Sequence, residues 1–151
     1  MAKPPIASWQ TLSKFPGGKK LFSLLLGWTV PYSGSISPEI TELSPGHAEV
    51  LARDRRRLRN HLGSIHAAAL MNLAELASGL AFVASLPAGV KGIVSRFEIE
   101  YLKKARGTLR ARCDCEAPKD FNDATYLVSV EIFNEAKETV ARATATWRVR
   151  K

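Results

Sequence analysis

The N-terminal part of the chain shows the three-and-four spacing of apolar residues that is typical of helices. The run Pro-Gly-Gly at positions 16–18 interrupts this spacing, so we expect two helical pieces, the first of which Ser8 can cap. Pro31 is expected to end the second piece. That piece carries a wide apolar stripe formed by Leu21, Phe22, Leu24, Leu25 and Trp28. Residues 1–34 are therefore predicted to form a helical extension that packs on the rest of the domain.

From Ser35 onward the pattern changes to the alternation of apolar and polar residues that is typical of strands. Two short strands, at 36–43 and 47–54, flank a Ser-Pro-Gly turn and are expected to form a hairpin. Four longer alternating runs follow Gly89, and their connections are short, which implies an antiparallel meander. These four runs are residues 92–103, 108–116, 125–134 and 140–150.

A long helix is predicted between the hairpin and the four later strands, over residues 65–86. Its apolar residues recur at three and four, and it is rich in alanine and glycine, which let another backbone approach closely. Such a helix suits the inside of a tightly curled sheet. Residues 35–151 are therefore expected to form one α+β domain, a curled six-stranded antiparallel sheet wrapped around this helix. The other face of the sheet, or an edge, is left for a partner subunit.

The length of 151 residues and the hydrophobic fraction of 46% suit one folded domain. No apolar run reaches the roughly 18 residues that a membrane span requires, so no span is expected. Cys113 and Cys115 are the only cysteines, and we interpret them as core residues of a strand, in keeping with a reducing cytoplasm. No further cysteine or histidine is close to them, so no metal site is predicted.

The formal net charge of +8 favours an anionic partner. Three interpretations stay open: a solvated basic surface, a site for the phosphates of coenzyme A, and a nucleic-acid surface. Stacking aromatics are not interleaved with the basic clusters, which counts against a single-strand nucleic-acid binder. The clusters include Arg53, Arg55, Arg56, Arg57 and Arg59, then Lys103, Lys104 and Arg106, and finally Arg148, Arg150 and Lys151.

Candidate chemistry lies at the start of the predicted long helix, in the run Arg-Asn-His-Leu-Gly-Ser-Ile-His-Ala-Ala-Ala at 59–69. The N–H groups of a helix N-terminus lack internal partners and can stabilise an oxyanion, at about 3 kcal/mol per donor. Glu75 follows on the same helix, and burial in an apolar groove would raise the pKa of its carboxyl toward that of a general base.

The nine residues from His66 to Glu75 span roughly 13.5 Å of helix, so the two ends cannot act on one bond within a chain. They could meet if antiparallel helices of two chains lie side by side. A small, polar stripe would serve as that contact, formed by Ala68, Asn72, Glu75 and Gly79. Structural interpretations stay open as well: Asn60 as a cap, His66 as a buried structural histidine, and Glu75 as an interface carboxylate.

This segment resembles the hotdog-fold thioesterases of the phenylacetate-pathway type, and more closely an uncharacterised hotdog branch known as a domain of unknown function. The resemblance rests on Asn60, Gly63 and His66, on an acid nine residues later, and on the order of elements from position 36 to the end. It implies that Asn60 contacts the thioester or orients water, and that Glu75 is the base or nucleophile.

The resemblance also gives the Ala67 N–H the task of polarising the thioester carbonyl, and it aligns His66 with the histidine of the family's His-Gly-Gly motif. Ala67 and Ala68 depart from the two glycines of that motif, which leaves the N–H donor but reduces the room for the carbonyl. Ser95 is a near match for a helper hydroxyl on the following strand.

The sequence thus predicts an acyl-CoA thioester hydrolase without a separate cofactor, since coenzyme A enters as part of the substrate. The alternative is a non-catalytic protein that binds acyl-CoA or an acyl chain, and a hydratase is a weaker third hypothesis. A cytoplasmic homo-oligomer, either a dimer or a dimer of dimers, is expected in each case. The residues assigned to substrate binding are Gly63, Ser95, Arg57, Arg59, Lys103 and Lys104.

Overall fold

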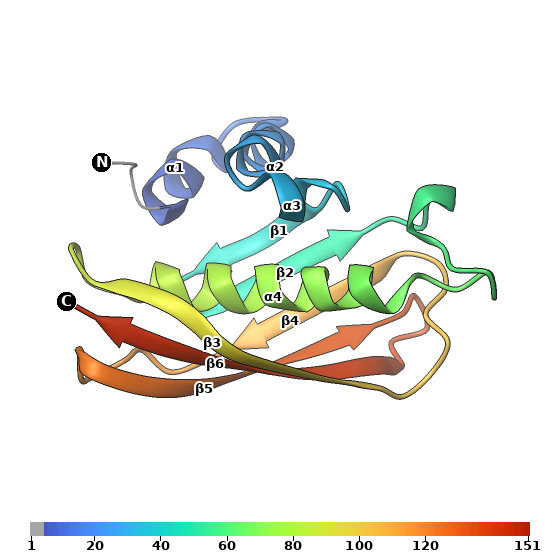
Figure 1. Cartoon of the computed structure of the whole chain (residues 1–151). Helices are drawn as coiled ribbons and strands as arrows, with labels where there is room; N and C mark the ends of the chain where they lie inside the picture. Colours follow the sequence, from blue (N-terminus) through green and yellow to red (C-terminus); the bar gives the residue numbers. More distant parts are fainter. Residues whose placement is uncertain (1–4) are drawn as a thin grey trace.

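The computed structural model describes residues 5–151 as one layer of sheet that curls behind a long helix, with three helices above it (Figure 1). The elements in chain order are α1 (Pro5–Leu12), α2 (Gly18–Thr29), α3 (Pro31–Gly34), β1 (Glu39–Ser44), β2 (His47–Ala52), the 3-10 turn η1 (Arg56–Leu58), α4 (Ala67–Ala84), β3 (Lys91–Tyr101), β4 (Leu109–Asp114), β5 (Asn122–Phe133) and β6 (Thr139–Arg150).

The sheet has six strands in the order β1-β2-β4-β5-β6-β3, and every neighbouring pair is antiparallel. The predicted class, an antiparallel sheet of six strands around one long helix with helices at the N-terminus, is therefore confirmed. The predicted hairpin is confirmed too, since β1 pairs with β2.

The expectation of one meander through the last four strands is wrong. Only β4, β5 and β6 follow one another in the sheet, while β3 lies at the far edge beside β6 and β4 pairs with β2. The reason is the helix that precedes β3, because α4 crosses the sheet and delivers the next strand to its opposite edge (Figure 1). Alternation of apolar residues reports which face a side chain takes, and it carries no information on strand order.

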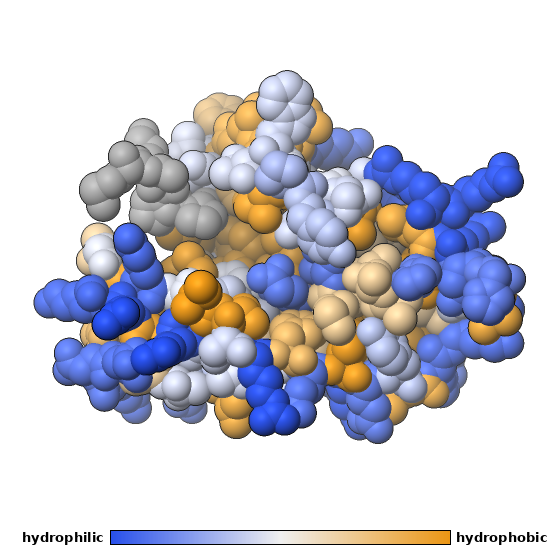
Figure 2. Space-filling view, viewed as in Figure 1, coloured by the Kyte–Doolittle hydropathy of each residue, from blue (hydrophilic) through white to orange (hydrophobic). Residues whose placement is uncertain are grey.

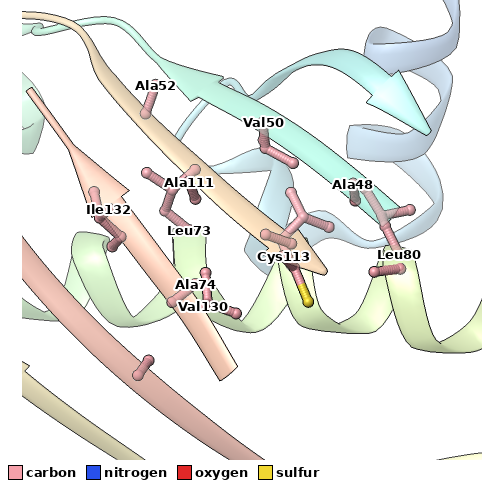
Figure 3. Packing of buried hydrophobic residues seen from close by; sticks show 14 of the residues in the cluster. Ala48, Val50, Ala52, Leu73, Ala74, Leu80, Ala111, Cys113, Val130 and Ile132 are labelled. Carbon is pink, nitrogen blue, oxygen red and sulfur yellow. The ribbon is translucent and has the colours of Figure 1, made fainter. Parts of the chain in front are cut away.

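The core lies between α4 and the concave face of the sheet (Figure 3). Leu73, Ala74 and Leu80 of α4 are buried against side chains that are mostly small. The sheet contributes Ala48, Val50 and Ala52 from β2, Ala111 and Cys113 from β4, and Val130 and Ile132 from β5. Small residues on both sides allow the helix to lie close to the sheet, as its alanine-rich sequence predicted. Full burial of one leucine stabilises the fold by roughly 2 kcal/mol.

The boundaries of two helices differ from the sequence prediction, and a third, short helix was not predicted. The first helix begins at Pro5, so Ser8 lies inside it rather than at its cap. Helix α2 ends at Thr29, before Pro31 as predicted, and Pro31 then begins the short helix α3, since its fixed φ suits the first helical position. The long helix is shorter than the predicted 65–86, because His66 caps it and the chain leaves it at Ser85.

The apolar stripe of the second helix divides into two parts. Phe22 packs inward, where its ring meets that of Trp9 edge-on at 5.2 Å between centroids. The remaining members of the stripe, Leu21, Leu24, Leu25 and Trp28, are exposed.

In the described part of the chain, one edge of the sheet is covered by a helix, and the other is not. Helix α2 covers the β1 edge, where Ser23 Oγ accepts the Ile40 N–H at 2.9 Å and Lys19 Nζ donates to the Thr41 carbonyl at 2.7 Å. The other edge is β3, which pairs on one side only, with β6, among the described strands. An uncovered edge strand of this length is a template for another chain.

One helix, α4, is long and apolar enough to cross a membrane by length and composition alone. However, 61% of it is buried within the fold, as in the core helix of a globular domain.

Candidate active site at the start of the central helix

The N-terminus of α4 is capped by His66, whose Nδ1 accepts the Ala68 N–H at 3.1 Å. Because Nδ1 accepts, the proton of the neutral imidazole lies on Nε2, which leaves that atom as a donor. His66 is exposed, so the interpretation of it as a buried structural histidine is wrong. Its role in holding the helix start is nevertheless structural.

The Ala67 N–H is a free donor at this helix end. Among residues 5–151, no acceptor lies within hydrogen-bond distance of it, and Ala67 itself is exposed. It lies next to the capped Ala68 N–H, at the positive end of the helix dipole. The Ala67 N–H is therefore available for the oxyanion role that the resemblance implies.

Tyr101 is a neighbour of this site that the sequence analysis did not single out. It lies at the end of β3, and its Oη donates to the Ala67 carbonyl at 3.1 Å. Burial raises the pKa of its phenol. Tyr101 is 45% exposed, and nothing in the sequence linked it to Ala67.

Asn60 organises the loop that leads into α4. Its Oδ1 accepts the N–H groups of Leu62 at 3.0 Å and Ser64 at 3.1 Å. The oxygen is therefore committed to the loop, so the Nδ2 amide is the part of Asn60 that can meet a ligand. Gly63, in the same loop, has φ +65° and open space where a Cβ would lie. The predicted cap role of Asn60 is thus replaced by a turn within the loop.

The connection between β3 and β4 lies against this loop. The Ala105 carbonyl accepts both the Ser64 hydroxyl at 2.9 Å and the Ile65 N–H at 2.8 Å. This contact places Lys103 and Lys104 beside the entrance to α4. Lys103 is paired there with Glu138 at 2.6 Å.

Glu75 lies two turns along α4 and is half-buried. Among the described residues, its carboxylate has no hydrogen-bond donor or cation within contact distance. Burial alone raises the pKa of the Glu75 carboxyl. A carboxylate without a compensating charge is poised to take up a proton, as a general base must.

The free N–H of Ala67 and the carboxylate of Glu75 stand on one continuous helix, eight residues or about 12 Å apart. They cannot reach the same carbonyl carbon within one chain. Ala68 and Met71, which lie between them along α4, are exposed.

The predicted small, polar stripe of α4 is only partly free. Asn72 is buried, and its Nδ2 donates to the Tyr32 carbonyl of α3 at 3.0 Å. Gly79 is covered by the ring of Trp147, to which a Cβ would approach at 3.4 Å. A partner helix could therefore contact Ala68 and Glu75 but not the whole stripe, because the chain's own helices and strands cover the rest.

The remaining predicted contacts lie farther from the helix start. Arg57 donates to the Ser37 hydroxyl, and Arg59 pairs with Asp54 at 2.7 Å. Ser95 lies in the β-bulge of β3, where its Oγ donates to the Thr146 carbonyl at 3.2 Å. Six strand residues, about 20 Å, separate Ser95 from the end of β3 beside Ala67. Within one chain, the structure does not bring Ser95 to the site.

Cys113 lies in the core of β4 as the sequence predicted, whereas Cys115 follows the end of that strand and is only partly buried. Both are free, and Cys113 is buried in the core. The neighbouring Cys115 and burial raise the pKa of the Cys113 thiol. Among residues 5–151, no group of three or more His, Cys, Asp or Glu residues could hold a metal ion.

Comparison with known proteins places this chain in a family. Residues 18–149 match the model of the domain of unknown function DUF4442. A crystal structure from a genomics programme is 36% identical, covers 99% of each chain and has a TM-score of 0.85. No protein with a curated function matches the sequence.

Two further structures carry thioesterase names. A protein of unknown function from Pseudomonas aeruginosa, described as a probable thioesterase, is 23% identical, with a TM-score of 0.77 over 90% of this chain and 96% of that one. A mutant of a hypothetical thioesterase from Streptococcus pneumoniae is 26% identical, with a TM-score of 0.64 over 74% of this chain and 88% of that one. The chain therefore belongs to the DUF4442 family, an uncharacterised branch of the hotdog-fold, thioesterase-like proteins.

Proposed function

We propose that this protein hydrolyses acyl thioesters, with acyl-CoA as the substrate class, in sites shared between two chains. The observation that carries the proposal is the half-buried Glu75 carboxylate, which has no partner among the described residues and lies on the same helix as the free Ala67 N–H. The thioesterase names of the similar structures support the reaction class.

In the proposed reaction, the thioester carbonyl oxygen accepts the Ala67 N–H of one chain. Glu75 of the partner subunit removes a proton from a water molecule, and the oxygen of that water attacks the carbonyl carbon. The tetrahedral oxyanion is stabilised at the helix N-terminus. Its collapse breaks the carbon–sulfur bond, and the departing thiolate takes the proton back from the Glu75 carboxyl. The products are the carboxylic acid and free coenzyme A. Asn60 Nδ2 and His66 Nε2 would orient the thioester group.

A homodimer provides this arrangement. Helix α2 occupies the β1 edge, which leaves β3 as the edge where a second sheet can pair. Antiparallel pairing of two β3 strands about a twofold axis would bring the open faces of the two α4 helices together. A dimer of such dimers would leave this contact unchanged.

The basic residues at the site entrance suit the phosphates of coenzyme A. Lys103 and Lys104 lie on the connection that contacts the Ser64 loop. Arg57 and Arg59 would join them, although each already holds a hydroxyl or carboxylate of its own chain. The free thiols suit a reducing compartment, and we place the protein in the cytoplasm.

The second candidate function is acyl-CoA binding without turnover. Ala67 and Ala68 favour it, because their methyl groups narrow the approach to the N–H donor where the resembled thioesterases have glycines. The two functions differ only in whether the thioester bond breaks.

One experiment separates them. The purified protein is incubated with acyl-CoAs of increasing chain length, and the released thiol is measured with a thiol reagent. We expect release by the wild type and a loss of at least about a hundredfold in Glu75→Gln. The matched control is Glu116→Gln, an exposed carboxylate beyond β4, which should leave the rate unchanged. Thermal stabilisation by acyl-CoA without thiol release would instead assign the protein to binding.

A further inference from the structure

Large apolar side chains are exposed along the second and third helices. Seven of the thirteen exposed large hydrophobic residues of the described chain lie between positions 15 and 32. Trp28 is 81% exposed and Tyr32 is 72% exposed. Figure 2 shows apolar surface gathered at the top of the molecule, over α2. We call this surface the α2–α3 face, formed by Phe15, Leu21, Leu24, Leu25, Trp28, Val30 and Tyr32.

The fold holds this face rigidly. Phe22 and Ser23 fasten the opposite side of α2 to the core and to β1. The backbones of α2 and α3 touch at Gly27 and Gly34, where a Cβ on Gly34 would come within 2.3 Å of the Gly27 carbonyl oxygen. Helix α2 is therefore packed firmly on one side, and its exposed apolar side chains form a surface with a fixed shape.

The charged residues of the segment that carries the face are all basic. Residues 1–38 contain four lysines and no aspartate or glutamate. Lys19 is held by Thr41 and lies over the Trp9 ring at 5.6 Å, while Lys14 and Lys20 are exposed beside the face. An exposed apolar stripe flanked by lysine is typical of helices that lie in the interface of an anionic membrane.

A groove of about 630 Å³ opens beside the face, between α2, α3 and the start of β1. Leu24 and Trp28 line one wall, and Lys20 and Arg55 supply cations. The one acidic residue of the lining, Glu39, is paired with Arg53, whose hydrogen bond lowers the pKa of the Glu39 carboxyl. The groove thus combines an apolar wall with net positive charge, which suits a lipid chain with an anionic headgroup.

A second copy of the chain fits this face poorly. A twofold contact would bring Lys14 and Lys20 of both copies into one interface, where the first 38 residues offer no acidic side chain to pair with them, and like charges repel. The protein also carries a net charge of +8, so its own surface offers little to complement these lysines. A bilayer supplies both the apolar phase for leucine and the headgroup level that tryptophan and tyrosine favour.

We propose that the α2–α3 face docks on an anionic phospholipid bilayer, with Leu21, Leu24, Leu25 and Trp28 inserted below the headgroups and Lys14, Lys20 and Arg55 at the phosphates. This docking is independent of thioester hydrolysis, since the face lies on helices that contribute no residue to the proposed active site.

The test uses the full chain and vesicles of phosphatidylcholine, either pure or with about 30% phosphatidylglycerol. Co-sedimentation should occur with the anionic vesicles and fall as salt is added. Tryptophan fluorescence gives a second readout, because Trp9 and Trp147 are 6% and 5% exposed, so a blue shift on binding reports Trp28.

Variants locate the contact. Leu24→Ser and Trp28→Ser should each weaken vesicle binding about tenfold, and Lys20→Gln about fivefold. The matched controls are Leu127→Ser, an exposed leucine on β5, and Lys119→Gln, an exposed lysine between β4 and β5, neither of which should change binding.

Four results would overturn the proposal. These are no binding to anionic vesicles, equal binding to neutral vesicles, equal loss in the β5 control, or a change in oligomeric state when Leu24→Ser is examined by light scattering. The last result would assign the face to a second copy. A blue shift with an acidic acyl carrier protein but not with vesicles would assign it to a protein partner and would also count against the bilayer.

Discussion

Burial alone raises the pKa of the Glu75 carboxyl, which is the property that the proposed reaction uses. Its pKa is raised in the folded state, so the folded protein binds this proton more tightly than the unfolded chain does. Glu75 therefore costs no stability below its unfolded pKa, and stability is lost as the pH rises through the folded value.

Glu75→Gln resembles the protonated form at every pH. We expect its melting temperature to match that of the wild type near about pH 4 and to exceed it near about pH 8. Thermal unfolding followed by circular dichroism at both pH values measures this, with Glu116→Gln as the exposed control. A Glu75→Gln protein that is less stable than the wild type at the higher pH would mean that Glu75 has a stabilising partner.

His66 has a separate structural task as the cap of α4. His66→Ala removes the acceptor of the Ala68 N–H and should destabilise the fold by about 1 kcal/mol. His66→Ser restores an N-cap acceptor, so it should recover that stability in urea unfolding. Equal losses in the two variants would show that the imidazole contributes by packing rather than by capping.

At the scale of elements, α2 and α3 depend on a backbone contact between two glycines. Gly34→Ala places a methyl group within 2.3 Å of the Gly27 carbonyl oxygen, which should cost about 1–3 kcal/mol. Gly27→Ala meets only the Gly34 Cα at 3.2 Å and gains about 1 kcal/mol of helix propensity, so it should be nearly neutral.

Urea unfolding of the two glycine variants checks this asymmetry. If Gly34→Ala is as stable as Gly27→Ala, the helices do not pack as closely as the structure shows. Because this contact orients Trp28 and Tyr32, Gly34→Ala should also weaken vesicle binding.

Sequence patterns predicted most elements and their buried faces. The alternation in β2 and β6 identified the side chains that face α4, and the alanine content of α4 indicated a close approach to the sheet. The order of the strands was not predictable in this way. Strand β3 pairs with β6, and β4 pairs with β2, and both pairings join residues that are far apart in the sequence. The division of the α2 stripe also needed the structure, because periodicity does not distinguish a core face from a face that remains exposed.

At the scale of the whole molecule, the two edges of the sheet decide how it can assemble. Ser23 and Lys19 satisfy backbone groups of β1, whereas β3 keeps its outer edge open beside the free face of α4. The sequence predicted Asn60, His66, Ala67 and Glu75 as site residues, and the structure adds the free N–H, the cap and the Tyr101 contact. The proposed meeting of these residues across two chains would depend on how two copies pair, and neither the sequence pattern nor the structure of one chain contains that information.

Mixing two inactive variants tests the shared site most directly. Glu75→Gln removes the base, and Ala67→Pro removes the N–H donor. Proline is tolerated at Ala67 because this is the first helical position. The φ and ψ of the preceding His66, −64° and 141°, also suit a residue before proline. Each purified variant alone should hydrolyse acyl-CoA at background rate. After unfolding and refolding together in equal amounts, half of the dimers are mixed and each has one intact site, so about a quarter of the wild-type rate should return. A mixture no more active than the separate variants would contradict a site shared between two chains.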